Sequence, residues 1–431
     1  MSSVAIFGIL TAVLLAIGAP IPVTVGLSSI VYILLEGIAP MIVIQRLFAG
    51  VDQAALLAIP FFILAGDLMN RGGIAKRLVR LANKAVGNRT GGLAIVAIIV
   101  CMFFAAISGS GVATAAAIGG VMFGGMAAMG YPKNYSAAVI ASASPIGVII
   151  PPSISFVTFG VLTGASIADL YKAGIPAGII MGAALMVAAY LTSKKNGYQG
   201  KNAKFSDPKA EAEFNQPYEK RDVIEVLFAL GTPVIIVGGV FGGWFTPTES
   251  AVVAVIYSLV IGAFVFKEIK IKSLFPVFKS SALGAARIMF IIANATVFAW
   301  ILAYEQIPQM LMQSVMNLTS NKFLLLLIVN AILLVAGAFM ETGSIILIAT
   351  PLLLPIMNAI GIDLVHFGII ITVNTAIGLL TPPFGVCLYT ASNVAGVTVQ
   401  DTIKRVWPFL GAMIVAMMII TYWPQIIMFM V

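Results

Sequence analysis

Long apolar stretches alternate with short polar ones along the whole chain. Apolar runs cover residues 4–18, 22–36 and 55–70, and similar runs recur until the last, at 407–430. A helix of about 20 apolar residues crosses a bilayer, whereas the strands of a membrane barrel would alternate apolar and polar positions. The pattern predicts an all-α polytopic membrane protein.

Two apolar runs, at about 136–165 and 366–394, are interrupted by paired prolines. Ile-Gly-Val-Ile-Ile-Pro-Pro at 146–152 matches Ile-Gly-Leu-Leu-Thr-Pro-Pro at 377–383, 231 positions later. Proline lacks an N–H and clashes with the preceding turn, so each helix should break there. Paired broken helices are typical of the substrate and ion sites of secondary transporters. The alternative is a kink that only shapes packing.

Two further apolar segments, about 93–129 and 323–360, each divide into two arms around a small polar tip. The tips are Ser108-Gly109-Ser110-Gly111 and Met340-Glu341-Thr342-Gly343. Each arm is marginal in length for a full crossing. Irregular backbone at membrane depth needs protein or a wet cavity around it. We therefore expect two re-entrant helical hairpins.

Charge predicts how the two halves are oriented. Segment 71–89 carries six basic residues and no acidic one, with apolar positions spaced for a helix along the cytoplasmic surface. The equivalent segment of the second half, 309–327, carries one lysine. Equivalent segments of different charge should lie on opposite sides of the membrane, which indicates inverted repeats. The repeats are expected at 1–192 and 225–431, joined by a hydrophilic cytoplasmic linker, 193–224.

Composition supports a protein embedded in the lipid bilayer. The chain is 61% hydrophobic and 9% charged, where a soluble protein has about 25% charged residues. The net charge of +8 fits basic cytoplasmic loops and does not indicate nucleic-acid binding. No GxxxxGK[ST], HExxH or GxSxG is present, so the sequence does not suggest an ATPase or another enzyme. Cys101 and Cys387 are expected to be buried, inert thiols.

At these motifs the chain resembles the large membrane subunit of tripartite ATP-independent periplasmic (TRAP) transporters. The residues that carry the resemblance are Ile59–Gly66, Ala106–Gly111, Gly147–Ser153, Ala173–Gly178 and Thr381–Gly385. The family usually has an aspartate where this chain has Glu341. The resemblance implies a multi-pass protein of the bacterial inner membrane that imports small organic acids, of the sialic acid or C4-dicarboxylate type, with sodium.

The resemblance also implies two protein partners and a mechanism. The partners are a small four-helix membrane subunit and a periplasmic substrate-binding protein that delivers the substrate. The mechanism is an elevator, in which the two hairpins and two broken helices move as one block against a scaffold of the remaining helices. No cofactor is implied beyond sodium as the coupling ion.

Sodium in broken-helix transporters is held by hydroxyls and by carbonyls of unwound backbone. Proline frees such carbonyls, and glycine lets a hairpin tip approach the break. We expect two sodium sites related by the repeat. The first comprises Ser108, Gly109, Ser110, Gly147, Ile150 and Pro151, and the second Glu341, Thr342, Gly343, Gly378, Thr381 and Pro382. For any one Ser or Thr, helix capping or back-bonding is the alternative.

An anionic substrate is expected between the hairpin tips, near Ser108, Ser153, Thr342 and Asn374. For Asn374, as for Asn294, hydrogen bonding between helices is the alternative to lining a cavity. Glu341 could help to bind a cation, carry a proton or cap the second hairpin arm. Arg287 is expected near the cytoplasmic end of its helix, where snorkelling competes with substrate contact.

Two other functions fit a polytopic α-helical protein. A stand-alone sodium/carboxylate symporter would need no binding protein, and an ion channel would show unitary conductance rather than saturable, sodium-dependent uptake. The membrane part of an ATP-driven importer would in addition require a separate ATPase chain. Paired hairpins beside broken helices favour a secondary transporter.

Overall fold

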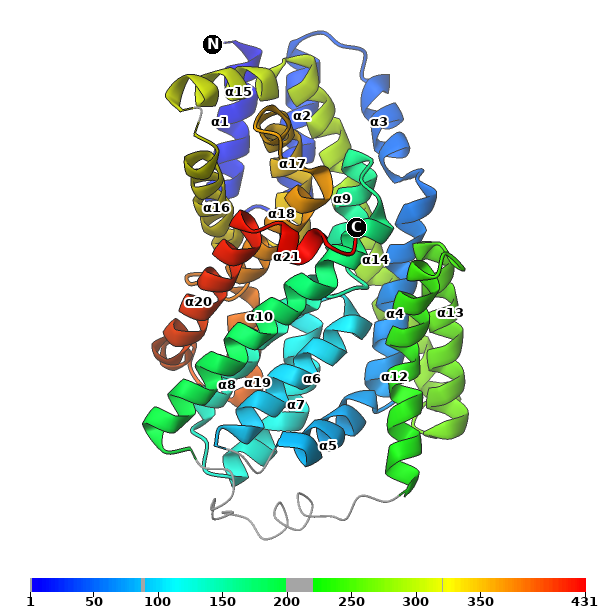
Figure 1. Cartoon of the computed structure of the whole chain (residues 1–431). Coiled ribbons are helices and arrows are strands. Elements are labelled where there is room, and N and C mark those ends of the chain that lie inside the picture. The colour runs from blue at the N-terminus through cyan, green and yellow to red at the C-terminus, as the bar shows by residue number, and fades with distance from the viewer. Residues whose placement is uncertain (1, 87–89, 199–219, 320) are drawn as a thin grey trace.

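The structure is a computed structural model that describes residues 2–86, 90–198, 220–319 and 321–431. Within these ranges the regular secondary structure is entirely helical (Figure 1). Nine of the described helices are long and apolar enough to cross a membrane: Ala54–Arg71, Gly111–Ala128, Ile167–Asn196, Val223–Phe241, Pro247–Val265, Ile271–Tyr304, Lys322–Phe339, Thr342–Ala359 and Val399–Tyr422. This confirms the prediction of an all-helical polytopic membrane protein.

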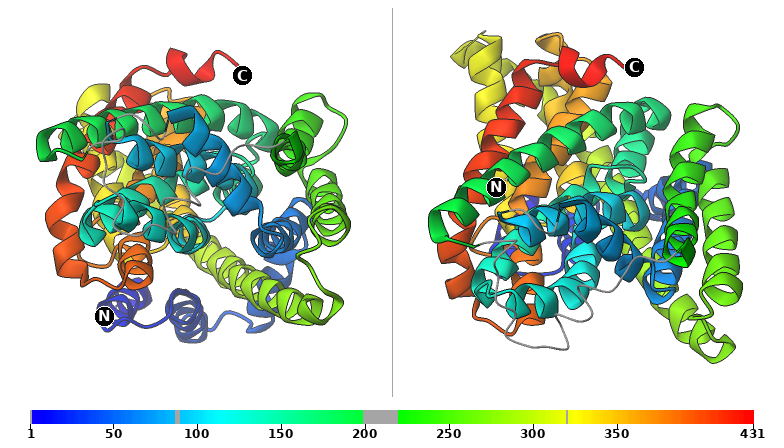
Figure 2. Two further views of the ribbon diagram at one scale, coloured as in Figure 1. Left: turned by 90° about the horizontal axis from the view of Figure 1, so that it is seen from below. Right: turned by 60° about the horizontal axis from the view of Figure 1, so that its bottom comes forward.

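One group of helices, here called the scaffold, packs around the long helix α14 (Ile271–Tyr304). It consists of α1 (Ser3–Ala16), α2 (Ile21–Leu35), α3 (Met41–Val51), α4 (Ala58–Arg71), α12 (Lys220–Phe241), α13 (Pro247–Val260) and α14. Helices α2, α3 and α4 contact α14, and α13 lies along α4. Figure 2 shows α14 crossing the molecule obliquely beside the α12–α13 pair. Phe7, Tyr32 and Phe298 form an aromatic contact between α1, α2 and α14.

The two predicted hairpin segments each form two helices joined by a short tip. The first consists of α6 (Gly92–Ser108) and α7 (Gly111–Ala128). The second consists of α16 (Lys322–Phe339) and α17 (Thr342–Ala359). Figure 1 shows α6 and α7 in the lower half of the molecule and α16 and α17 in the upper half.

Both proline-interrupted segments are broken helices. In the first, α8 (Lys133–Ala143) and a 3-10 turn (Ser144–Val148) precede the break, and α9 (Ile154–Thr163) follows it. In the second, α18 (Leu364–Gly378) precedes the break and α19 (Val386–Ala395) follows it. Both Pro-Pro peptide bonds are cis. Helix α9 packs on α17 and α19 packs on α7, so each broken helix contacts the hairpin of the other half.

The remaining helices surround this block of hairpins and broken helices. The basic segment forms α5 (Ile74–Val86), drawn at the lower end of Figure 1, and α15 (Ile307–Leu318) lies at the upper end. The long helices α10 (Ile167–Asn196) and α20 (Val399–Tyr422) pack together, and the short α21 (Gln425–Met428) closes the chain. The arrangement places both hairpin tips toward the scaffold.

Several helices extend beyond the predicted spans. Helix α14 begins at Ile271, not at 281, and α10 runs on to Asn196. Charged residues end an apolar run in the sequence, but they do not end the helix. The helix continues beyond the lipid, with its charged side chains in water. The last span was predicted as 407–430, but α20 begins at Val399 and stops at Tyr422, before Pro424. Most of the expected linker, 199–219, lies outside the described residues.

Candidate functional site

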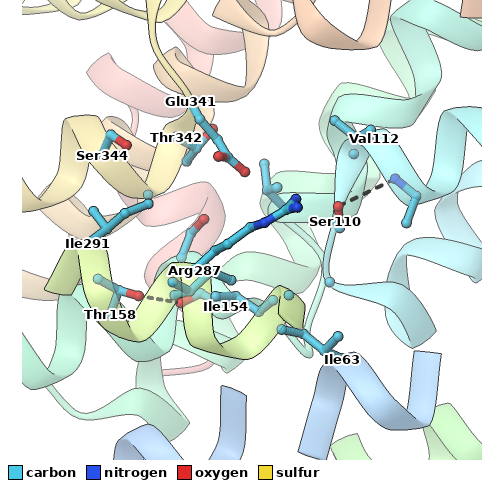
Figure 3. Close-up of a pocket in the computed structure, with 18 of the residues that line it drawn as sticks. Ile63, Ser110, Val112, Ile154, Thr158, Arg287, Ile291, Glu341, Thr342 and Ser344 are labelled. Atoms are coloured by element: carbon cyan, nitrogen blue, oxygen red, sulfur yellow. Dashed lines mark hydrogen bonds between the residues drawn. The ribbon is translucent and has the colours of Figure 1, made fainter. Parts of the chain in front are cut away.

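A cavity of about 540 Å³ lies between the scaffold and the two hairpin tips. Scaffold helices α2, α4 and α14 form one wall, and the tips with the start of α9 form the other. Figure 3 shows the side chains that enter it. Its polar lining comprises Asp67, Asn70, Ser108, Ser110, Ser155, Thr158, Arg287, Glu341, Thr342 and Ser344.

The first hairpin tip is held together by its own hydroxyls. The Ser108 hydroxyl lies 2.9 Å from that of Thr114, and the Thr114 hydroxyl donates to the Ser110 carbonyl at 2.8 Å. Ser110 is the N-cap of α7, and its side chain accepts from the Ala113 N–H at 3.4 Å. Ser110 therefore makes the capping bond that was the alternative for its hydroxyl, and Thr114 back-bonds to the Ser110 carbonyl, whereas Ser108 does neither.

Glycines let the first tip meet the first break. Gly109 has φ +60°, and a Cβ there would lie 2.8 Å from the Pro152 carbonyl oxygen. A Cβ on Gly147 would lie 2.9 Å from the carbonyl oxygen of Ser110. Real Cβ atoms do not approach this closely, so the two backbones are in contact only because side chains are absent. The predicted neighbours Ser110 and Gly147 are therefore together.

The second hairpin meets the second break through the last turn of its first arm, just before the tip. A Cβ on Gly378 would lie 2.3 Å from backbone atoms of Gly337, in the last turn of α16. Glu341 occupies the N-cap position of α17, but its side chain makes no capping hydrogen bond. The capping interpretation of Glu341 is therefore wrong. Thr342 is 2% exposed, and its hydroxyl has no hydrogen-bond partner.

Half of the predicted sodium residues line the cavity and the other half lie outside its lining. Ser108, Gly109, Ser110, Glu341, Thr342 and Gly343 line it. Of the break residues, Gly147 and Gly378 contact the hairpins, and Thr381 donates its hydroxyl to the Ile377 carbonyl at 2.9 Å. Ile150 packs against Gly178 of α10. Pro151 is buried and Pro382 half-buried, each in a cis Pro-Pro pair.

The structure does not bring two of the predicted substrate residues to the cavity. Ser153 is fully buried and donates to the Val148 carbonyl at 2.6 Å, closing the first break. Asn374 is fully buried, and its amide donates to Asn330 of α16 at 2.8 Å. Hydrogen bonding between helices is thus the contact that the structure shows for Asn374. Asn294 donates to the Phe290 carbonyl of its own helix at 2.8 Å, and its side chain packs against Gly26 of α2.

Sequence reasoning missed Asp67 and misplaced Arg287. Asp67 lines the cavity from α4, and the Ser281 hydroxyl donates to its carboxylate at 2.6 Å. A carboxylate inside an apolar run was the signal that could have identified it. Arg287 lies 16 residues from the start of α14 and 17 from its end, so it is not near a helix end. Its guanidinium group enters the space between Glu341 and Ser110 (Figure 3).

The fold and this cavity define a class of protein, a polytopic membrane permease. The fold also resembles two solved transporters: YdaH of Alcanivorax borkumensis (TM-score 0.62, 14% identity, 89% of this chain and 87% of that chain) and MtrF of Neisseria gonorrhoeae (TM-score 0.57, 10% identity, 87% and 82%). At such low identity the likeness concerns the fold alone.

The sequence comparisons then establish the family. Residues 8–426 match the family model of the tripartite ATP-independent periplasmic transporter, DctM component. The chain belongs to this family of large permease subunits. It is a multi-pass protein of the bacterial inner membrane and a transporter subunit, not an enzyme.

Three relatives illustrate the range of named substrates. The isethionate TRAP transporter permease DctMQ of Oleidesulfovibrio alaskensis is 42% identical over 97% of this chain, which spans 65% of that relative's length. The C4-dicarboxylate large permease DctM of Rhodobacter capsulatus is 37% identical, covering 99% of this chain and 98% of that protein. The sialic acid large permease SiaM of Vibrio cholerae is 36% identical, covering 88% and 87%.

Proposed function

We propose that this permease imports a small organic acid coupled to sodium by an elevator movement. The observation that carries the proposal is that two hairpin tips, each set against the break of its own half, open onto one cavity. Permease relatives are named for C4-dicarboxylates, sialic acid and isethionate, which are all small organic anions. The shared chemistry supports an organic acid as the substrate.

We assign one sodium site to each hairpin and break. The first comprises Ser108, Gly109, Ser110, Gly147, Ile150 and Pro151, and the second Glu341, Thr342, Gly343, Gly378, Thr381 and Pro382. Sodium needs oxygen ligands, and a helix break supplies carbonyls that no N–H claims. The buried Thr342 hydroxyl without a partner supports the second site, because such a group costs free energy unless a ligand satisfies it.

The two halves are proposed to be inverted repeats, 1–192 and 225–431, whose hairpins and broken helices move together. Contacts between α9 and α17 and between α19 and α7 join the hairpins and broken helices of both halves into one block. At one point where this block meets the scaffold, the scaffold residue is a glycine: a Cβ on Gly66 of α4 would lie 3.3 Å from the Ser108 Cα. A contact that no side chain obstructs would allow the block to slide along the scaffold.

Membership of a tripartite family supports two partners. We propose a small four-helix membrane subunit beside this chain and a periplasmic binding protein that delivers the substrate. Because the binding protein selects the molecule first, the permease cavity need not distinguish substrates with the same stringency.

The test is uptake into proteoliposomes that contain this chain with its small membrane subunit. Labelled organic acids are offered with and without the binding protein, under a sodium or a potassium gradient. We expect uptake only with sodium and the cognate binding protein. Uptake with sodium but without binding protein would indicate a stand-alone symporter, and conductance without saturable uptake would indicate a channel. Either result would contradict the tripartite mechanism.

A further inference from the structure

The cavity carries an unequal set of charges. Among the described residues that line it, Arg287 is the one cation, and Asp67 and Glu341 are the two acids. Arg287 and Asp67 come from the scaffold helices α14 and α4, and Glu341 comes from the second hairpin tip. The cavity can therefore offer a single fixed positive charge to an anion.

Arg287 has no partner of its own in the described structure. Its side chain is exposed to the cavity, and no described residue forms a hydrogen bond or an ion pair with it. Glu341 is also exposed, and its carboxylate does not come within 4 Å of Arg287 or any other described cation. Charged side chains at membrane depth usually pair with one another, so an unpaired one facing a cavity indicates a ligand.

The two acids differ in their surroundings. Asp67 is half-buried and already accepts a hydrogen bond from Ser281 at 2.6 Å, so it is held on the scaffold wall. Glu341 belongs to the proposed second sodium site, where a bound cation would balance its charge. With a sodium ion in each of the two proposed sites, these ions and Arg287 carry three positive charges against the two negative charges of Asp67 and Glu341. The remaining single positive charge balances one substrate charge, and Asp67 repels any second one.

We propose that this permease selects a monoanionic substrate whose single acidic group binds Arg287, and that it disfavours dianions. The proposal rests on the proposed function, in that it assumes the cavity holds the substrate. A second ionised group would exceed the single net positive charge of the sodium-loaded cavity and would lie in a cavity that also contains Asp67. In a poorly hydrated site, an unpaired charge is a strong means of rejecting the wrong ligand. The hydroxyl groups that line the cavity can form hydrogen bonds with uncharged polar groups in the rest of the substrate.

The test compares acids that differ by one charge at nearly constant shape. The probes are succinamate with succinate, and D-gluconate with D-glucarate. Binding to the purified chain with its small membrane subunit is measured in sodium by isothermal titration calorimetry at neutral pH. We expect each monoanion to bind at least about tenfold more tightly than its dianionic partner, which corresponds to about 1.4 kcal/mol.

Variants identify the groups responsible. Arg287→Gln should abolish monoanion binding, and Arg287→Lys should retain part of it. Lys279→Gln is the matched control, because it removes an exposed cation from the same helix outside the cavity and should leave binding unchanged. Asp67→Asn should reduce the difference in binding affinity between the monoanion and the dianion of each pair. Thermal unfolding without probe verifies that each variant is folded.

Three results would overturn the inference. They are equal or tighter binding of the dianions, unchanged binding by Arg287→Gln, and the absence of binding by every probe. The proposed function is tested separately by sodium-dependent uptake with the binding protein. Sodium-dependent uptake that ignores substrate charge would refute the monoanion proposal and leave sodium-coupled import standing. Charge-selective binding without sodium-dependent uptake would refute sodium-coupled import and leave the monoanion proposal standing.

Discussion

Gly337 and Gly378 touch through their backbones, with room for no side chain between the hairpin and the break. A Cβ on Gly378 would lie 2.3 Å from the Gly337 Cα and carbonyl carbon. Backbone atoms on both sides leave no flexible side chain that could move away. This contact sets the distance between α16 and α18, and hence the geometry of the proposed second sodium site.

Gly378→Ala is expected to destabilise the protein and weaken its response to sodium. Overpacking of a tight contact costs about 1–3 kcal/mol, and the added methyl group would push the break away from the tip. The thermal unfolding temperature of the purified chain, with and without sodium, measures both effects. Gly411→Ala is the control, because nothing lies within 4 Å of a Cβ on Gly411. Equal behaviour of the two variants would contradict the prediction.

Thr342→Val should remove sodium binding without harming the sodium-free protein. The Thr342 hydroxyl is buried without a partner, so its loss should change the sodium-free stability by less than about 1 kcal/mol, or even raise it. A ligand that binds only the folded state stabilises it, so the variant should lose the sodium-induced shift in unfolding temperature.

Thr350→Val tests whether this effect belongs to the site. Thr350 is also on α17, fully buried, and its hydroxyl also lacks a partner, but it does not line the cavity. We expect Thr350→Val to retain the full sodium response. A loss of that response in both variants would mean that packing in α17, and not the Thr342 hydroxyl, governs the effect.

Glu341→Gln separates the charge of this residue from any structural role. Because its side chain does not cap α17, the substitution should leave the unfolding temperature nearly unchanged. We expect the sodium concentration for half-maximal uptake to rise on the order of tenfold, since a cation loses its neighbouring carboxylate. Glu341→Asp should keep near-normal sodium dependence.

Glu249→Gln provides the contrasting case. Glu249 completes a capping box at the start of α13, accepting from the Thr246 N–H at 2.8 Å. There the substitution should lower the stability only slightly, because the glutamine oxygen can still accept the Thr246 N–H without the negative charge, and it should leave the sodium dependence of uptake unchanged. If Glu341→Gln instead behaved like Glu249→Gln, its role in the site would be refuted.

The elements were predictable from the sequence, whereas the walls of the cavity were not. Prolines in apolar runs and glycines at their tips predict breaks and hairpins from local chemistry alone. Arg287 and Asp67 are different, because their place depends on how α14 and α4 face the hairpins. The apolar pattern also predicted that this span begins at 281, which placed Arg287 too close to a helix end. Ser153 and Asn374 illustrate the converse, since the Ser153 hydroxyl and the Asn374 side-chain N–H group donate to partners inside the protein.

Gly66→Ala probes the proposed sliding of the hairpin block against the scaffold. A Cβ at Gly66 would lie 3.3 Å from the Ser108 Cα and 3.5 Å from the Ile107 carbonyl oxygen. Backbone atoms cannot rotate away, so the first hairpin should pass α4 less easily. We expect sodium and substrate binding to persist while the uptake rate falls several-fold, because each kcal/mol added to a barrier slows a step about fivefold.

Gly284→Ala is the matched control for this movement. Gly284 is a scaffold glycine on α14 that also lines the cavity, but a Cβ there would meet only the flexible side chain of Ile63, at 3.6 Å. Its uptake rate should stay close to that of the unmodified protein. If Gly66→Ala transported at the normal rate, the α4 contact would not be a sliding surface. If it lost sodium binding as well as rate, the methyl group would be distorting the first tip rather than slowing its passage.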